Sequence, residues 1–406
     1  MGLLTSLAAL FAIAFCLSSP ALAALHHQAG AAPKRAVTPA WRLDLRSTIG
    51  SVPLGLVVGQ GHETQLQPHT SLRFLDDATI VVTFVVREGE GNPKLSRRDG
   101  SDENLPLRLR AVFLDTATGK VTATRDWPSE SRYAHIVATH GNGEFVTERG
   151  TQLTLYSKDS RELKKLELPP TKETGWVAHP SPTGNNIVFI AENLITRSSV
   201  PWIWVDTDKL RVLRSWEEIQ SGWVGISDKW IAMTACVWFH DCEPYVEVRG
   251  FATDWKSIAS ASRHQKPHPQ FIDDDLLFLL ARPTRLLRSD GEAVLLDDMP
   301  FGGCWWGSAV PSASGRRVAV PSCKLTGKVA ALDIGGVEVL EKILLYDAPF
   351  HGLAYALDIE GPKIKELTQL AISPDGLTLA VLNDEFVEVF QLPASADGEP
   401  FRAAPE

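Results

Sequence analysis

Across residues 41–393 the chain repeats one pattern: a short apolar run, a tight polar turn and a second apolar run. In the last copy, the apolar residues 370–372 lead into Ser373-Pro-Asp-Gly376, and the apolar residues 379–382 follow. Apolar runs of this length predict β-strands, and Gly, Asn, Asp and Ser between them predict the tight turns of hairpins. Seven such turns are centred near residues 77, 142, 184, 228, 274, 315 and 375.

The spacing of the turns indicates a repeated four-stranded unit. Successive turns lie 65, 42, 44, 46, 41 and 60 residues apart. Four of these intervals match a repeat of about 40–45 residues, and the two long ones contain insertions at residues 88–104 and 324–336. Several repeats carry a second hairpin, for example residues 202–205 and 210–213 around a short turn. Two hairpins per period predict one four-stranded antiparallel sheet per repeat.

The repeat resembles that of a known architecture. Leu370 to Val381 resembles the strand–turn–strand phrase of WD40-like and TolB-like β-propellers, and Asp115 to Lys120 resembles the turn between their outer strands. The resemblance covers most of residues 41–393 and implies an all-β, seven-bladed propeller of four-stranded antiparallel blades. Phe390-Gln391 stands where WD40 proteins carry Trp-Asp, so the resemblance concerns architecture and not family. Two β-sandwiches are the alternative, which seven evenly spaced hairpins disfavour.

Closure of such a ring needs a strand from the other end of the chain. The last repeat supplies about three strands, near residues 368–372, 377–382 and 385–391. Residues 41–45 (Trp-Arg-Leu-Asp-Leu) can supply the fourth. We expect this pairing because it fastens the ring and removes its open edges, which otherwise promote aggregation.

The two ends of the chain predict an exported protein. Residues 1–33 contain no charged side chain, and residues 7–17 form an apolar run of signal-peptide length. Ala21 and Ala23 fit the small-residue cleavage rule, so we expect a signal peptide over 1–23 and a secreted or periplasmic protein. The leader lacks a basic residue before its apolar run, so an uncleaved anchor is the alternative. Residues 24–40 are predicted to be a flexible linker, and residues 394–406 a disordered tail.

Composition and charge narrow the possible partners. With 40 Lys+Arg and 49 Asp+Glu the net charge is −9, which disfavours binding to nucleic acid. Beyond the leader, no stretch is long and apolar enough for an integral membrane span. We expect a monomer with a protein or peptide partner and without a cofactor or metal ion.

Four of the five cysteines lie outside the predicted leader. In a propeller, the first strand of a blade starts on the face where its second strand ends and its third begins. Cys236 ends a second strand and Cys242 begins a third, so we expect a disulfide between them. Cys304 precedes a first strand and Cys323 ends the adjoining second strand, so we expect another. Free buried thiols are the alternative, and the cysteine spacings match no common zinc finger.

Both predicted disulfides fall on the same face, and aromatic residues lie in the loops that they close. Because pinned loops lose less entropy on binding, we predict a binding surface there. The charged insertion in the first repeat should rise on the same face. The alternatives are that the tryptophans pack between blades and that the insertion is simply solvated. The candidate binding residues are Trp238, Phe239, His240, Trp305, Trp306, Arg97 and Arg98.

Catalytic motifs are weak. The chain has no Gly-x-Ser-x-Gly elbow, phosphate-binding glycine loop or His-Glu-x-x-His sequence. Asp273-Asp-Asp275 occupies a predicted hairpin turn, where Asp is common. His264 and His268 are a further candidate pair for metal binding. We therefore expect a non-catalytic binding or scaffold module. A propeller enzyme, such as a glycan hydrolase or lyase acting at the central channel, is the alternative, and a purely structural domain is a third possibility.

Overall fold

The computed structural model describes most strands and the turns at one end of them. The described ranges are residues 34–36, 38–45, 71–87, 106–131, 134–171, 176–191, 199–219, 224–235, 245–250, 256–260, 268–280, 284–288, 293–296, 309–326, 337–347, 353–358, 369–383 and 386–392. Among them, no helix is long and apolar enough to cross a membrane. The predicted leader and the predicted tail lie outside these ranges.

The described strands form seven sheets, and six of these have four antiparallel strands. From inner to outer strand, three of the sheets contain β3 (Ser71–Asp76), β4 (Thr79–Arg87), β5 (Leu107–Asp115) and β6 (Val121–Ser129); β7 (His135–Thr139), β8 (Phe145–Arg149), β9 (Gln152–Tyr156) and β10 (Glu162–Glu167); and β11 (Trp176–Pro180), β12 (Asn186–Ala191), β13 (Ser199–Asp206) and β14 (Arg211–Ile219).

The remaining sheets continue the same order. Two contain β15 (Val224–Ile226), β16 (Trp230–Ala235), β17 (Tyr245–Gly250) and β18 (Lys256–Ser260); and β19 (His268–Phe271), β20 (Leu276–Leu280), β21 (Thr284–Arg288) and β22 (Ala293–Leu296). The last two contain β23 (Val310–Pro311), β24 (Arg317–Thr326), β25 (Val337–Asp347), β26 (Leu353–Asp358) and β1 (Lys34–Ala36); and β27 (Gln369–Ile372), β28 (Thr378–Asn383), β29 (Phe386–Gln391) and β2 (Trp41–Asp44).

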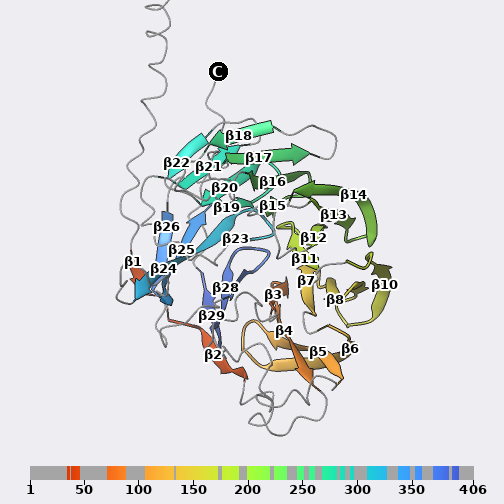
Figure 1. Cartoon of the computed structure of the whole chain (residues 1–406). Helices are drawn as coiled ribbons and strands as arrows, with labels where there is room; N and C mark the ends of the chain where they lie inside the picture. Colours follow the sequence, from red (N-terminus) through yellow and green to blue (C-terminus); the bar gives the residue numbers. More distant parts are fainter. Residues whose placement is uncertain are drawn as a thin grey trace, which may run out of the picture.

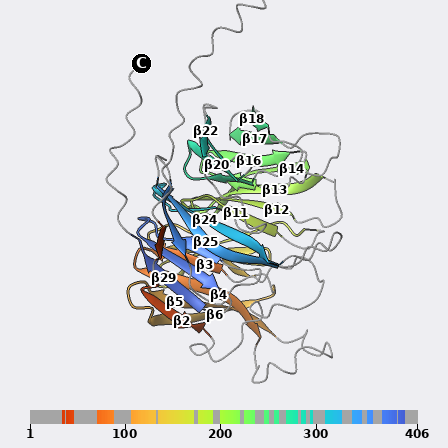
Figure 2. The ribbon, with the colours of Figure 1, turned by 90° about the vertical axis from the view of Figure 1, so that its left-hand side faces the viewer.

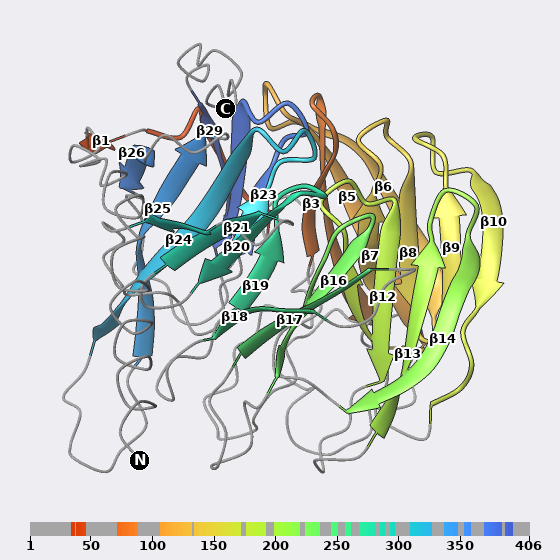
Figure 3. The ribbon, with the colours of Figure 1, turned by 90° about the horizontal axis from the view of Figure 1, so that it is seen from above.

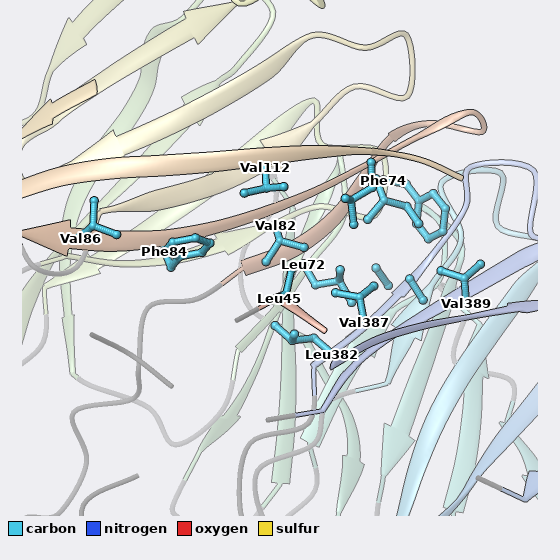
Figure 4. Close-up of a cluster of buried hydrophobic side chains, with 14 residues drawn as sticks. Leu45, Leu72, Phe74, Val82, Phe84, Val86, Val112, Leu382, Val387 and Val389 are labelled. Atoms are coloured by element: carbon cyan, nitrogen blue, oxygen red, sulfur yellow. The ribbon is translucent and has the colours of Figure 1, made fainter. Parts of the chain in front are cut away.

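The sheets follow one another around a centre lined by their first strands, as Figure 1 shows, so the chain is a β-propeller. The architecture-level resemblance is thereby confirmed. Figure 2 faces the edge of the ring that carries β24, β25 and β29. Apolar clusters fill the spaces between neighbouring sheets. In the cluster of Figure 4, Leu72 and Phe84 from one end of the chain pack with Leu382 and Val387 from the other. Burial of this apolar surface holds the ring together.

Tryptophans contribute to several of these clusters. Trp202 and Trp204 are buried, with 1% and 2% of their surfaces exposed. Trp176 is half-buried and packs against the same cluster. Trp230 is half-buried and packs against the cluster between the next two sheets. Trp223 lies outside the described residues.

The predicted closing strand is confirmed. β2 pairs antiparallel with β29 and becomes the outermost strand of the last sheet. Its Trp41 indole Nε1 donates a 2.8 Å hydrogen bond to the carbonyl of Thr116, in the outer turn of the first repeat. Leu45, directly after β2, is fully buried between the two ends of the chain. The N-terminal segment therefore joins the last sheet to the first.

One sheet differs from the predicted four-stranded pattern because it has five strands. β1 lies parallel to β26 at the outside of that sheet, as Figures 1 and 3 show. Residues 34–36 belong to the segment that we expected to be a flexible linker. The sequence there, Lys-Arg-Ala, has no alternating apolar pattern, which is why it did not predict a strand.

The turns between the first and second strands meet in a ring of their own, here called the turn ring (the seven segments centred near residues 77, 142, 184, 228, 274, 315 and 375). Neighbouring turns are bonded to one another. For example, the Asp375 N–H donates to the Asp77 carboxylate at 2.9 Å. Other links join Gly143 N to Leu75 O, Asp228 N to Asp274 Oδ1, Thr183 Oγ1 to Asp228 and Ser314 N to Pro374 O. These bonds fix the spacing of the sheets at one face of the ring.

Arg317 strengthens the turn ring from inside. Its side chain is 1% exposed, and its Nε donates a 2.6 Å hydrogen bond to the Asp347 carboxylate on the neighbouring strand. Nη1 donates a 3.0 Å hydrogen bond to the carbonyl of Gly376, in the turn of the next sheet. The guanidinium thus donates to two different sheets through two separate N–H groups. A lysine ammonium in this position would reach only one of the two acceptors well.

The contact between the closing strand and the first sheet can be tested at Gly119. Gly119 has φ of +69°, and a Cβ there would lie 2.7 Å from Cδ2 of Trp41. Gly119→Ala should therefore combine backbone strain of about 1 kcal/mol with displacement of the Trp41 ring. Gly150→Ala is the matched control, because Gly150 has φ of +77° but its nearest neighbour would be 3.7 Å away. Chemical denaturation should show a larger loss of stability for Gly119→Ala than for Gly150→Ala. Equal losses would contradict close packing of the Trp41 ring against Gly119.

Candidate functional site

The predicted binding residues fall on segments that the described structure does not cover. Arg97, Arg98, Trp238, Phe239, His240, Trp305 and Trp306 lie outside the described residues. Cys236, Cys242 and Cys304 lie outside them as well. The backbone of Cys323 is described: it belongs to β24 and pairs with Leu340 of β25. The predicted site and both disulfides therefore stay predictions.

The described strands do define the face from which these segments depart, here called the loop face, opposite to the turn ring. The strand pairs Arg87↔Leu107 and Ala235↔Tyr245 end there, on either side of residues 88–106 and 236–244. β24 also ends at this face, and β23 starts there. Because antiparallel strands alternate in direction, the strand ends that flank the candidate loops all open toward the loop face.

Polar side chains tie neighbouring inner strands together between the two faces. The Arg73 Nε in β3 donates a 3.3 Å hydrogen bond to the carbonyl of Ile136 in β7. On the other side of β3, the Leu72 N–H donates to the Gln369 side-chain oxygen at 2.9 Å. Burial lowers the pKa of Arg73 to about 10, and the guanidinium is still charged at neutral pH. These hydrogen bonds connect β3 to the inner strands on both of its sides.

His179 in β11 is a second titratable group of the inner wall. Burial lowers the pKa of its imidazole to about 4, because the charged form loses hydration there. The side chain is therefore neutral at physiological pH. Among the described residues, no three His, Cys, Asp or Glu side chains are grouped so that they could hold a metal ion.

Two buried carboxylates occupy separate parts of the ring. Glu148 in β8 is 4% exposed, and burial raises its pKa well above the ordinary range. Glu388 in β29 is 1% exposed, and burial raises its pKa despite Arg42, whose Nε lies 3.5 Å from its carboxylate. The sheet of β3–β6 lies between their two sheets, so they do not form the close carboxylate pair that glycoside hydrolysis requires.

The acidic residues of the turn ring are used for structure. Asp273 Oδ1 accepts the Asp275 N–H at 2.8 Å and so caps its own turn. Asp274 Oδ2 lies 3.0 Å from the Lys229 ammonium, and Oδ1 accepts the Asp228 N–H. The interpretation of residues 273–275 as a hairpin turn is confirmed.

Sequence reasoning missed the titratable side chains that lie within these strands. Arg73, His179, Glu148 and Glu388 each interrupt a strand whose other residues are mainly apolar or buried. A charged residue flanked by strand-forming apolar residues was the available signal. It shows that a charge enters the sheet packing, although it does not show which group faces it.

Comparison with known proteins identifies the fold without a family. No family model matches the chain, and neither does any curated protein. A solved structure titled "Crystal Structure of Mitotic Checkpoint Complex" contains a chain with 10% identity and a TM-score of 0.50, covering 90% of this chain and 98% of that chain. An oligogalacturonate lyase in complex with manganese has 13% identity, a TM-score of 0.49 and coverages of 80% and 96%. The acylaminoacyl peptidase of Pyrococcus horikoshii has 10% identity, a TM-score of 0.48 and coverages of 81% and 52%. At such identities, the first likeness supports the propeller fold alone.

The buried Glu148 carboxylate makes stability depend on pH. Its Oε2 has no hydrogen-bond partner among the described residues. Because its folded-state pKa is raised, the folded protein holds this proton more tightly than the unfolded chain does. Stability should therefore fall as pH rises from the ordinary glutamate pKa through the folded-state value. Glu148→Gln should remove this dependence and stabilise the protein at pH 8 by about 1–3 kcal/mol.

Thermal unfolding between pH 4 and 8 measures this effect. Glu130→Gln is the control, because Glu130 is exposed and its change should leave the curve as it is. A Glu148→Gln variant that is less stable than the wild type at pH 8 would show that the ionised carboxylate has a stabilising role.

Proposed function

We propose that this chain is an exported, non-catalytic β-propeller that binds a protein or peptide partner on its loop face. The observation that carries the proposal is the position of the strand ends: those flanking both cysteine-containing loops and the charged insertion open toward one face of a ring. Rigid scaffolds with loops gathered at one face are a common basis for binding sites. Export rests on the uncharged, apolar leader of residues 1–23.

We also propose that the five-stranded sheet is the seventh blade of one closed ring. Its strands β23 to β26 have the same antiparallel order as the other sheets. It packs through Val318 and Leu344 on the β19–β22 side, and through Ala319 and Ile343 on the β27–β29 side. Its first turn also takes part in the turn ring, through Ser314.

The register of the described strands is compatible with the two predicted disulfides. Cys236 directly follows Ala235, which pairs with Tyr245, so a disulfide to Cys242 would close the short connection between these two strands. Val310 pairs with Ala319, and Cys323 lies further along β24, so a disulfide from Cys304 would join the segment that leads into β23 to this strand. Disulfides at these points would hold Trp238, Trp305 and Trp306 in place, and rigid aromatic side chains are typical energetic centres of interfaces.

The binding proposal is tested by replacing the three loop tryptophans together. Trp238→Ala, Trp305→Ala and Trp306→Ala in one variant should reduce partner recovery in a crosslinking pull-down from the native envelope. The loss should correspond to about 2 kcal/mol or more, as at interface hot spots.

The matched control replaces exposed apolar residues on outer strands, with Val121→Ala, Val212→Ala and Leu213→Ala, each at 39–42% exposure. This control should keep full recovery. If the tryptophan variant recovers every partner as the wild type does, the loop face is not the binding surface.

The disulfide pairing is tested by peptide mapping without reduction. We expect Cys236 linked to Cys242 and Cys304 linked to Cys323, because the flanking strands lie side by side. A link between Cys236 and Cys304 would mean that the loops are arranged differently. Free thiols at all four positions would remove the pinned loops from the argument.

A further inference from the structure

We propose that the outer edge of β26 accepts an extended peptide strand from a partner protein, and that β1 occupies this edge in cis. This surface lies on the rim of the ring and is separate from the loop face, so it does not depend on the function proposed above. The mode of binding is strand addition, in which main-chain hydrogen bonds supply most of the affinity.

The edge of β26 already holds a strand that its sheet does not need. Strands β23 to β26 complete the same four-stranded arrangement as the other sheets, and β1 adds a fifth. Lys34 pairs with Ala356, Arg35 with Leu357 and Ala36 with Asp358, all in parallel. Within the described ranges, the outer strands β6, β10, β14, β18 and β22 carry no additional strand. The occupied edge therefore distinguishes this sheet.

The neighbouring β2 shows what a structural N-terminal strand looks like here. β2 completes a sheet that otherwise has three strands, and Trp41 and Leu45 anchor it by a hydrogen bond and by full burial. β1 completes nothing: the ring closes through β2 without it. Loss of β1 would therefore leave the propeller intact.

β1 is also easy to displace. It pairs through three residues, whereas β2 pairs through four and continues into buried Leu45. Parallel pairs are slightly less stable per residue than antiparallel ones, and a three-residue ladder contains few hydrogen bonds. The backbone of Ala40 is already fixed by a 2.7 Å bond to Val389, so β1 can leave without disturbing the closing strand.

β1 indicates which kind of segment fits. The occupant runs parallel to β26 and has basic and small residues, Lys34-Arg35-Ala36. A protein with net charge −9 favours a basic occupant, and Asp358 stands at the end of the acceptor strand. We therefore expect a partner segment that is extended, basic and free of proline within the paired residues.

The test frees the edge without removing the closing strand. In the full chain, Arg35→Pro with Ala36→Pro removes two adjacent β1 amide donors, so β1 loses an N–H donor toward β26 whichever of the two residues faces that strand. The probe is a fluorescent peptide with the sequence of residues 30–40. We expect this variant to bind the probe at least ten-fold more tightly than the wild type, in which the cis strand competes. The same peptide carrying both prolines should not bind.

Hydrogen exchange locates the probe, and its protection should be confined to residues 353–358. The triple tryptophan variant, with β1 also disabled, should bind the probe equally well, so failure here and failure at the loop face are distinguishable. Absence of binding, or protection elsewhere, would overturn the proposal. Dimers of the wild type that are lost in the double-proline variant would assign the edge to a second copy of this chain, and so would also overturn it.

Discussion

Closure of the ring by β2 is the interaction on which the rest of the structure depends. The C-terminal segment contributes three strands to the last sheet, and the fourth comes from residues near the other end of the chain. Without it, β29 would expose a full edge and the cluster that includes Leu45 and Val387 would open to water. Because Trp41 also bonds to the first sheet, one short segment joins both ends of the repeat array. These contacts oppose separation of the last sheet from the first, the step by which the ring would open.

The closed ring assigns different tasks to its two faces. At the turn ring, main-chain groups and carboxylates of neighbouring sheets bond to one another, and Arg317 bonds across a sheet boundary. Polar groups committed in this way are not available to a ligand. At the loop face, the connections between second and third strands vary in length, from residues 150–151 to residues 88–106, and they can change without breaking the turn-to-turn bonds. This division is a physical reason to look for binding at the loop face.

Most of the fold was predictable because its signals are local. Short apolar runs separated by Gly, Asn or Asp turns indicated the hairpins, and the turn glycines Gly143, Gly184, Gly315 and Gly376 do have positive φ. The closing strand was predictable because the last repeat lacked one. β1 was not, since three residues that pair through backbone atoms leave no pattern in the side chains. The burial of Arg73 and Glu148 was not predictable either, because it depends on packing between repeats. The candidate site was predicted from loops outside the described residues, so the structure supports its setting and leaves its contacts as predictions.

The Arg42–Glu388 pair explains how a strand as short as β2 keeps its register. A surface ion pair contributes little stability, and burial of Glu388 carries a desolvation cost. The pair instead disfavours other registers of β2 against β29. Arg42 pairs with Glu388 in the ladder, and its guanidinium lies 3.9 Å from the centre of the Phe386 ring. A slip by one residue would turn Leu43 and Leu45 away from the core and leave a buried carboxylate without its cation. Both penalties disfavour the shifted register, so the four paired residues of β2 adopt a single register against β29.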